Sequence, residues 1–408
     1  MKRRVVVTGM GGISPLGHDW KTVLSKLEQG ISAIAVNEEL GEYTGMDTRL
    51  AGRILDFERP ESYTRKRVRT MGRVSLMATR ACELALLDAN LDAVQDDPTV
   101  GISYGSTSGS PPAMDKYAKA LHTGELKRIR ATDYIQFMSH TVPANLAQFF
   151  QITGRLISTC SACTSGSQGI GFGLEAIQLG KQKIMLSGGA EEYSPMHTGV
   201  FDIMYATSTR NDEPHTTPRP FDRDRDGLVV GEGAGTLILE DLEHAEARGA
   251  SIYAEIVGWA INSDGKHVTN PDTQGMQRVM ELALEDAELD ASQIGYINAH
   301  GTATEVGDIA ESQAMQRLFG SQTPTSSLKS FMGHTLGACG ALEAWFTIEM
   351  MRANWFAPTL NLENVDPRCG ELDYVRGSGR TLETEYVMSN NFAFGGINTS
   401  LIFRRWAA

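Results

Sequence analysis

Cysteine is scarce in this sequence, and long apolar runs are absent. The five cysteines are odd in number and lack the spacing of a disulfide framework: Cys82, Cys160, Cys163, Cys339 and Cys369. Reduced thiols in a cytoplasmic protein are therefore expected. The apolar run after the basic residues 2–4 reaches Gly9 too soon for a signal peptide and predicts an opening strand. No segment approaches the roughly 20 apolar residues of a membrane helix, so a membrane is not an expected partner.

Positive charge is also in short supply, since 37 Lys and Arg residues stand against 50 Asp and Glu, a formal net charge of −13. A general nucleic-acid-binding protein would show a basic excess, so nucleic acid is not an expected partner. The chain is instead rich in core-forming residues, with 41% hydrophobic residues among 408. That length predicts two or three domains, or one large duplicated unit.

Short apolar runs alternate with amphipathic stretches along the chain, a pattern that predicts a layered α/β fold. Strands are expected at residues 4–8, 100–104, 183–187, 235–240, 253–260 and 294–298. Helices are expected at residues 73–89, 165–178, 277–286, 308–318 and 339–352. The weakest point of the pattern, residues 249–251, is the expected boundary between two domains, residues 1–250 and 251–408.

The two sides of this boundary resemble each other. Residues 158–178 and 326–350 both run from small polar residues through a reactive side chain into a Gly/Ala-rich helix. A strand followed by glycine also occurs near the start of each side. We therefore expect a duplicated βα unit with its chemistry at two equivalent helix starts.

The segment Ser-Ala-Cys-Thr-Ser-Gly places Cys163 just before the expected helix 165–178. The positive end of a helix favours the thiolate and lowers the pKa of a cysteine. A lone cysteine is more often buried and inert, but the glycine and serine context and the histidines described next favour a nucleophile. Cys160 completes a Cys-x-x-Cys motif without a second cysteine pair. A metal site is therefore not expected, and Cys160 is predicted to pack beside the nucleophile.

Two histidines and a lysine lie in similar small-residue turns. His300, in Asn-Ala-His-Gly-Thr-Ala-Thr, follows an expected strand, where α/β proteins build their sites, although a structural role fits it equally well. His334, in Met-Gly-His-Thr-Leu-Gly-Ala, precedes a helix whose positive end keeps an imidazole neutral. Lys329 is predicted to be buried and paired with Glu311. A thiol with these partners predicts acyl transfer through a thioester.

Seven motifs in order resemble those of the β-ketoacyl-acyl-carrier-protein synthases, the elongating condensing enzymes of type II fatty-acid synthesis. They are Val-Thr-Gly-Met-Gly, Ser-Ala-Cys-Thr-Ser-Gly, Gly-Gly-Ala-Glu-Glu, the run from Arg-Pro-Phe-Asp to Gly-Glu-Gly-Ala-Gly, His-Gly-Thr-Ala-Thr, Lys-Ser-Phe-Met-Gly-His-Thr-Leu-Gly-Ala and Asn-Phe-Ala-Phe-Gly-Gly-Ile-Asn. The resemblance covers essentially the whole chain. It implies a thiolase-like α/β fold, with duplicated βαβαβ halves in a five-layered α-β-α-β-α arrangement, and a dimer.

The resemblance also implies a mechanism. Cys163 takes an acyl group from an acyl carrier protein, and the backbone N–H groups of Cys163 and Phe394 form an oxyanion hole. His300 and His334 assist the decarboxylation of a malonyl carrier protein, whose carbanion attacks the acyl-cysteine to give a 3-oxoacyl carrier protein. The substrates arrive on phosphopantetheine, so no further cofactor is implied.

Further site residues are implied by the same resemblance. Thr302 and Thr304 bind the phosphopantetheine arm. Lys329 and Glu311 form a structural ion pair. The remaining implied neighbours of the substrate are the gating residue Phe394 together with Phe201, Phe392, Gly395 and Ser108.

Three positions depart from the common pattern of these enzymes. Ala393 replaces a glycine before the gating phenylalanine, which puts the flexibility of that loop in doubt because alanine restricts the backbone. Glu305 replaces a proline. Ser108 replaces a bulky residue of some relatives, which favours either a more open acyl tunnel for long, rigid or conjugated chains or neutral drift.

Two basic clusters stand out against the acidic background. Arg65, Lys66 and Arg69 align with the carrier-protein docking helix of the resembled enzymes, and a second cluster comprises Lys127, Arg128 and Arg130. A basic patch would steer an acidic carrier protein toward the site, whereas the ordinary interpretation is a solvated helix face.

Other functions remain open from the sequence. The chain resembles an elongating enzyme, or the ketosynthase of a specialised polyketide or aryl-polyene pathway paired with a subunit that lacks the cysteine. It could thus be a homodimer or a heterodimer. A non-catalytic partner subunit is disfavoured by Cys163, His300 and His334. A thiolase would use a second cysteine as its base, and a cysteine hydrolase would need a water-activating histidine.

Overall fold

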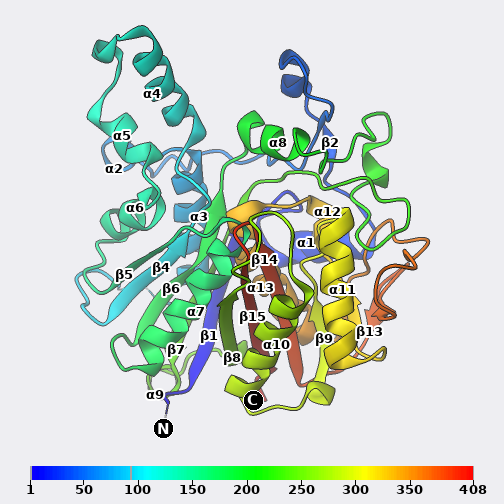
Figure 1. Cartoon of the computed structure of the whole chain (residues 1–408). Coiled ribbons are helices and arrows are strands. Elements are labelled where there is room, and N and C mark those ends of the chain that lie inside the picture. Colours follow the sequence, from blue (N-terminus) through cyan, green and yellow to red (C-terminus); the bar gives the residue numbers. More distant parts are fainter. Residues whose placement is uncertain (1, 92–93, 408) are drawn as a thin grey trace.

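In the computed structural model, which describes residues 2–91 and 94–407, one sheet of 11 strands runs through the molecule (Figure 1). Its strand order is β12-β10-β9-β14-β15-β8-β1-β7-β6-β4-β5. Antiparallel pairing of β1 (Val5–Ile13) with β8 (Ala254–Ser263) joins two half-sheets at its centre.

Each half of the sheet repeats the same topology. Numbering the main strands of each half from one to five along the chain gives the order 3-2-4-5-1 in both. The N-terminal strands are β1, β4 (Val100–Gly105), β5 (Leu156–Thr159), β6 (Ile184–Glu191) and β7 (Gly233–Asp241). The C-terminal strands are β8, β9 (Ile294–Asn298), β10 (Pro324–Ser326), β14 (Tyr386–Ala393) and β15 (Ile397–Arg405), with β12 (Asp373–Tyr374) at the edge. The expected duplication is confirmed.

Helices form three layers around the two half-sheets. The central pair is α7 (Ser165–Gln178) and α13 (Cys339–Ala353), which contact strands of both halves. The outer helices are α3 (Arg73–Asp88) on the N-terminal half and α10 (Thr273–Ala287) and α11 (Glu305–Phe319) on the C-terminal half (Figure 1). The central helices approach closely because Gly166 lacks a side chain, and a Cβ there would lie 2.9 Å from the backbone nitrogen of Ala341. The expected five-layered arrangement is confirmed.

The remaining helices and two small sheets lie around this five-layered core. The remaining α-helices are α1 (Trp20–Glu28), α2 (Arg65–Val68), α4 (Pro111–Thr123), α5 (Ala131–Phe137), α6 (Thr141–Phe150), α8 (Pro195–Asp202), α9 (Leu242–Ala247) and α12 (Lys329–Met332). The 3-10 helices are η1 (Glu38–Glu42), η2 (Leu126–Arg128), η3 (Ala162–Thr164), η4 (Pro214–Thr216), η5 (Ala291–Gln293) and η6 (Leu336–Ala338). Two small sheets pair β2 (Ala35–Val36) with β3 (Leu50–Ala51) and β11 (Trp355–Phe356) with β13 (Arg380–Thr381). Helices α4 and α5 project from the body (Figure 1).

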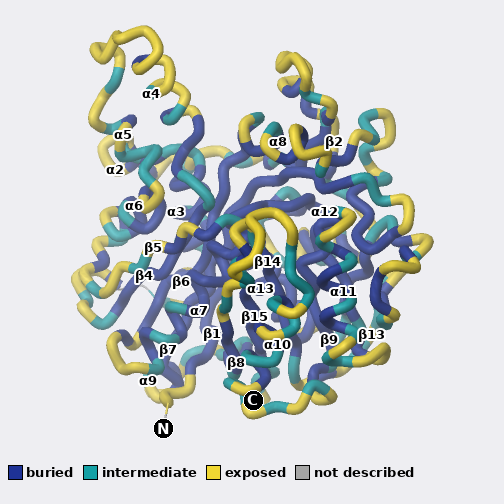
Figure 2. Tube along the Cα trace, viewed as in Figure 1, coloured by how far each residue is buried: buried dark blue, intermediate teal, exposed yellow. Residues whose placement is uncertain are grey.

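The central strands are buried on both faces (Figure 2). Strands covered on both faces form near-continuous apolar runs. The apolar residues 184–186 of β6 therefore predict a strand from the sequence alone. Strand β14 differs, because its buried interior contains Ser389, Asn390 and Asn391. A buried amide must find hydrogen-bond partners, and Asn391 finds one at the active site described below.

Sequence reasoning located the main elements. Strand β9 and helix α7 begin and end where expected. Strand β1 continues past the expected residue 8 to Ile13, because its glycines keep pairing with β7. Strands β5, β10, β14 and β15 were not expected. Among the described helices, none has both the length and the apolar character needed to cross a membrane.

Candidate active site

Cys163 lies in η3, directly before the start of α7 as expected, and η3 follows strand β5. The preceding residue, Ala162, has a φ of +49°, a left-handed conformation that costs a non-glycine residue free energy. The Ser165 hydroxyl stabilises this turn by accepting from the Ser161 N–H (3.0 Å) and donating to the Ala162 carbonyl (2.7 Å). The turn presents a thiol that is only 5% exposed.

His334 is the direct partner of this thiol. Its Nε2 lies 2.9 Å from Cys163 Sγ, and its Nδ1 accepts the backbone N–H of Leu336 at 3.3 Å. A neutral imidazole that accepts at Nδ1 carries its proton at Nε2. The ring therefore points an N–H at the sulfur.

His300 completes the cluster from the end of β9. Its ring centroid lies 5.2 Å from that of His334, in an edge-to-face arrangement. Burial, reinforced by the positive charge of Lys329, holds the pKa of both imidazoles well below the usual range. Both rings are therefore neutral and can donate an N–H to a developing oxyanion.

The resting state of the thiol differs from the sequence-based expectation. Burial raises the pKa of Cys163 to about 12, although Lys329 and the backbone N–H groups of Cys163 and Phe394 act in the opposite direction. The expected lowering by the start of α7 is wrong because desolvation of the thiolate outweighs the helix end. These two backbone N–H groups nevertheless lie close to the sulfur, so an acyl group on Cys163 would have its carbonyl oxygen near them, as the expected oxyanion hole requires.

The partner of Lys329 is Glu343, which corrects the expected pairing with Glu311. The Lys329 ammonium donates to Glu343 Oε1 at 2.5 Å, and both side chains are completely buried. The other oxygen, Oε2, accepts from Asn391 Nδ2 of β14 at 2.8 Å. Glu343 lies on α13, the α-helix that follows His334, so the counter-charge comes from α13 and not from α11.

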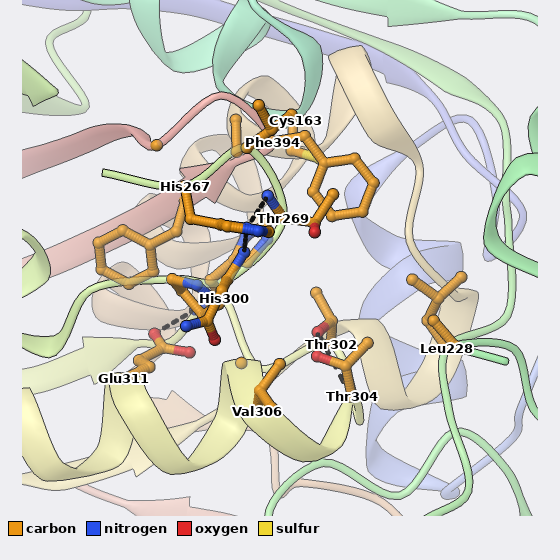
Figure 3. A pocket seen from close by; sticks show the side chains of 18 of the residues that line it. Cys163, Leu228, His267, Thr269, His300, Thr302, Thr304, Val306, Glu311 and Phe394 are labelled. Carbon is orange, nitrogen blue, oxygen red and sulfur yellow. Dashed lines mark hydrogen bonds between the residues drawn. The ribbon is translucent and has the colours of Figure 1, made fainter. Parts of the chain in front are cut away.

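Glu311 instead shapes the loop that carries His300. One oxygen accepts the backbone N–H of His300 at 2.7 Å (Figure 3). The other accepts the backbone N–H of Gly301, also at 2.7 Å. Burial raises the pKa of Glu311 to about 8. Its contribution to the site is therefore the orientation of the histidine backbone.

A pocket of about 410 Å³ leads to the cluster. Thr302 and Thr304 lie side by side on one wall, with their Oγ1 atoms 2.9 Å apart (Figure 3). Phe201 and Phe394 also line the pocket, with ring centroids 5.3 Å apart. The pocket thus joins a polar wall that suits an amide-containing arm to an aromatic wall near the thiol.

The comparisons with known proteins agree with this geometry. Residues 2–245 match the family model of the β-ketoacyl synthase N-terminal domain, and residues 253–363 match that of the C-terminal domain. The 3-oxoacyl-(acyl-carrier-protein) synthase 2 of Vibrio harveyi is 39% identical over 100% of this chain and 99% of its own. The chain belongs to the β-ketoacyl synthase family.

Solved structures extend the comparison. A β-ketoacyl synthase from Burkholderia phymatum STM815 has a TM-score of 0.98 and 56% identity, over 100% of both chains. A structure described as the ishigamide ketosynthase/chain length factor has a TM-score of 0.90 and 30% identity, again over 100% of both chains. The fold of this β-ketoacyl synthase is therefore shared along its whole length.

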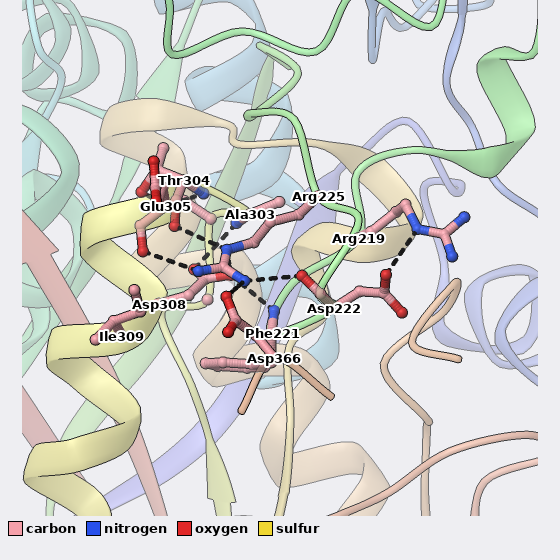
Figure 4. A network of polar contacts seen from close by, with 12 residues as sticks. Arg219, Phe221, Asp222, Arg225, Ala303, Thr304, Glu305, Asp308, Ile309 and Asp366 are labelled. Carbon is pink, nitrogen blue, oxygen red and sulfur yellow. Dashed lines mark hydrogen bonds and ion pairs between the residues drawn. The ribbon is translucent and has the colours of Figure 1, made fainter. Parts of the chain in front are cut away.

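A buried charge network, which the sequence did not reveal, holds the threonine wall of this synthase in place (Figure 4). Arg225 donates to the carbonyls of Thr304 (3.3 Å) and Glu305 (2.9 Å) and pairs with Asp366 (2.7 Å). Asp308 accepts the backbone N–H of Ala303 at 3.1 Å. The Arg-Asp-Arg-Asp motif around Arg225 was the one feature of the sequence that indicated this network. The partners of Arg225 lie far away in the sequence, so the motif alone did not identify them.

The gate loop tolerates its alanine. Ala393 ends β14 outside the left-handed region, whereas Gly395 and Gly396 have φ values of +90° and +69°. The glycines that the loop conformation requires are therefore present. Phe394 is 36% exposed and lines the pocket, and Phe392 lies against His300 with ring centroids 5.9 Å apart.

Several predicted residues lie elsewhere. Ser108 does not line the described pocket and contacts His197 instead. Cys160 is exposed, which corrects its expected packing role. The six basic residues of the two expected docking clusters are all exposed: Arg65, Lys66, Arg69, Lys127, Arg128 and Arg130. Glu305 is exposed and forms an ion pair with Arg368 at the first turn of α11.

One group of side chains within the described residues has the donor set of a metal site. Cys163 Sγ and a ring nitrogen from each of His300 and His334 lie within 4.8 Å of one another. The same three residues line the pocket. The Lys329 ammonium acts on all three, which disfavours a further cation there.

Proposed function

We propose that this enzyme condenses an acyl group held on Cys163 with malonyl acyl carrier protein, giving 3-oxoacyl carrier protein, CO2 and free carrier protein. The observation that carries the proposal is the 2.9 Å approach of His334 Nε2 to Cys163 Sγ, with a second neutral imidazole beside it. The names of the relatives at 39% identity support it.

In the first step the Cys163 sulfur attacks the thioester carbon of an acyl carrier protein. The thiol loses its proton as the new C–S bond forms, since the buried thiolate is unfavourable at rest. The N–H groups of Cys163 and Phe394 stabilise the oxyanion. Collapse of the tetrahedral intermediate breaks the old C–S bond, and the departing pantetheine thiolate takes up a proton.

In the second step malonyl carrier protein loses CO2. The electrons of the broken C–C bond move into the thioester carbonyl, and the enolate oxygen accepts N–H bonds from His300 and His334. Neutral imidazoles suit this role because each ring carries one N–H group that can donate a hydrogen bond to the enolate oxygen. Lys329 contributes by lowering the pKa of both rings.

In the third step the enolate carbon attacks the acyl-Cys163 carbonyl. A C–C bond forms, the C–S bond to Cys163 breaks, and the thiolate regains one proton taken up from solvent. The Lys329–Glu343 pair holds the ammonium within electrostatic reach of this thiolate. A water-excluding pocket favours carbon attack over hydrolysis.

The pocket walls assign binding roles. Thr302 and Thr304 hydrogen-bond the phosphopantetheine arm, and Phe394 with Gly395 opens and closes the passage. Phe201 and Phe392 line the path beside the thiol. Exposed Arg65, Lys66 and Arg69, with Lys127, Arg128 and Arg130, attract the acidic carrier protein.

A second pathway assignment has specific support. The ishigamide ketosynthase/chain length factor is 30% identical over 100% of this chain, so a type II polyketide or aryl-polyene pathway is the alternative setting. The enzyme would then pair with a subunit that lacks the cysteine, rather than with a second copy of itself. Conjugated carrier-bound products from a reconstituted pathway favour this alternative, and turnover limited to saturated chains contradicts it.

Mass spectrometry of the intact protein and of the carrier-bound product tests the main proposal. We expect acyl carrier protein to acylate Cys163 and malonyl carrier protein to convert that adduct into the 3-oxo product. Cys163→Ser should lose the adduct, while the matched control Cys369→Ser keeps it. Malonyl decarboxylation without an acyl-Cys163 intermediate would contradict the proposal.

A further inference from the structure

Three polar side chains from separate elements of the N-terminal half form a cluster outside the catalytic residues. Ser108 follows β4, Glu191 ends β6, and His197 lies on α8; together they form the Ser108 cluster. Ser108 Oγ lies 3.3 Å from His197 Nε2. Glu191 is completely buried, and His197 is 9% exposed.

Two acceptor atoms of this cluster lack a donor among the described residues: His197 Nδ1 and Glu191 Oε1. The Ser108 hydroxyl donates to the Gly109 carbonyl at 3.1 Å, so it accepts from His197 Nε2–H and leaves Nδ1 a bare acceptor. Glu191 Oε2 already accepts from the Gly337 N–H and from both donors of Thr107. A buried polar atom without a partner is costly, so these two acceptors favour a ligand that brings a donor.

The Ser108 cluster is connected to the nucleophile by two independent routes. His197 precedes Phe201 by four residues on α8, which places both on one face of the helix. Phe201 lines the pocket that contains Cys163. From the other side, the Cys160 thiol donates to the Thr107 carbonyl at 3.2 Å, beside Ser108. An acyl chain bound along α8 would pass Phe201 before it reaches His197, which lies beyond the lining of the Cys163 pocket.

We propose that this enzyme prefers acyl groups that carry a hydroxyl, alcoholic or phenolic, which donates to His197 Nδ1. The inference rests on the proposed function and names its acyl substrate class. A plain alkyl chain leaves this acceptor unsatisfied, and a carboxylate would place a second negative charge beside Glu191. An ammonium would have to be desolvated past Phe201, which costs more than burial of a neutral hydroxyl.

Matched acyl carrier proteins test this preference. The probes are hexanoyl, octanoyl and benzoyl carrier proteins, each with and without a terminal or para hydroxyl. The measured quantity is kcat/KM for acylation of Cys163. We expect the hydroxylated member of at least one pair to react about tenfold faster, the effect of one well-placed hydrogen bond to a buried group.

Variants of His197 separate recognition from simple packing. His197→Leu fills similar space without an acceptor and should reduce the ratio within that pair to about one. His197→Asn keeps an acceptor and should restore part of the ratio, while the exposed control His215→Leu should leave it unchanged. An equal rate for both members of every pair in the native enzyme overturns the inference, as does a preference that survives His197→Leu. Failure of every probe to acylate Cys163 would instead contradict the proposed function.

Discussion

Gly337 occupies in the C-terminal half the place that Cys163 occupies in the N-terminal half. Each is the middle residue of a 3-10 turn that begins with a residue at φ +49°, Ala162 or Leu336, and each turn leads into a central helix. The first copy presents the thiol. The second copy directs the Leu336 N–H to His334 Nδ1 and so orients the histidine. Duplication thus supplied the nucleophile and the device that orients its partner.

Gly337→Ala should damage catalysis more than folding. A Cβ at this position would lie 2.8 Å from the backbone nitrogen of Thr107 and 2.9 Å from Glu191 Oε2, so the turn that orients His334 must shift. A displacement of about 1 Å near reacting atoms can cost about a hundredfold in rate. We expect kcat to fall by at least tenfold in a steady-state condensation assay. The control is Gly41→Ala, whose Cβ would have no neighbouring atom closer than 3.7 Å. If Gly337→Ala and Gly41→Ala have the same kcat, the orienting role of Gly337 is refuted.

The pH dependence of Cys163 alkylation follows from its raised pKa. With a pKa of about 12, the thiol is neutral at physiological pH, and the thiolate fraction rises about tenfold per pH unit. Inactivation by iodoacetamide should therefore accelerate from about pH 6 to about pH 9 without a plateau. Glu191→Gln removes a charge that raises this pKa and should increase the rate at every pH. A plateau at neutral pH would show instead that a thiolate–imidazolium pair exists at rest.

The buried Lys329–Glu343 pair should be essential as a pair. Glu343→Ala leaves an unpaired buried ammonium, which typically costs about 3–5 kcal/mol of stability. The double variant Lys329→Met/Glu343→Leu removes both charges and should recover most of the free energy of unfolding, but not the condensing activity. Urea unfolding followed by circular dichroism measures the difference. If Glu343→Ala is as stable as the native enzyme, Glu343 is not the required counter-charge, and Glu311 takes that role instead.

The sequence predicted those parts of the fold that depend on local pattern. Strand β9 is an apolar run between turns and was located to the residue, whereas β14 was missed because Asn390 and Asn391 interrupt its apolar pattern. The strand expected at residues 4–8 stopped short of the glycines of β1, yet their backbone groups continue the pairing with β7. Long-range pairing thus decided what local propensity could not.

The same division applies to the site. Cys163, His300 and His334 were found from their motifs, and the structure brings all three together. The counter-charge of Lys329 was assigned wrongly, because Glu343 belongs to a helix that becomes adjacent only after α13 packs between the half-sheets. The Arg225 network was missed for the same reason: its partners Asp308 and Asp366 lie far from Arg225 in the sequence.

Charge reversal at Lys66 of α2 and at Arg69, directly after this helix, should weaken carrier-protein docking without affecting the chemistry. Lys66 and Arg69 are exposed, and neither lines the active-site pocket. Replacing both with Glu should raise KM for acyl carrier protein severalfold, most strongly at low ionic strength, because surface charges act mainly on encounter and are screened by salt. Iodoacetamide labelling of Cys163 should stay at the native rate. The matched control reverses Lys181 and Lys183, which lie beyond the far end of α7, about 20 Å of helix from the nucleophile. If both double variants raise KM equally, the net charge of the enzyme rather than the α2 surface attracts the carrier protein.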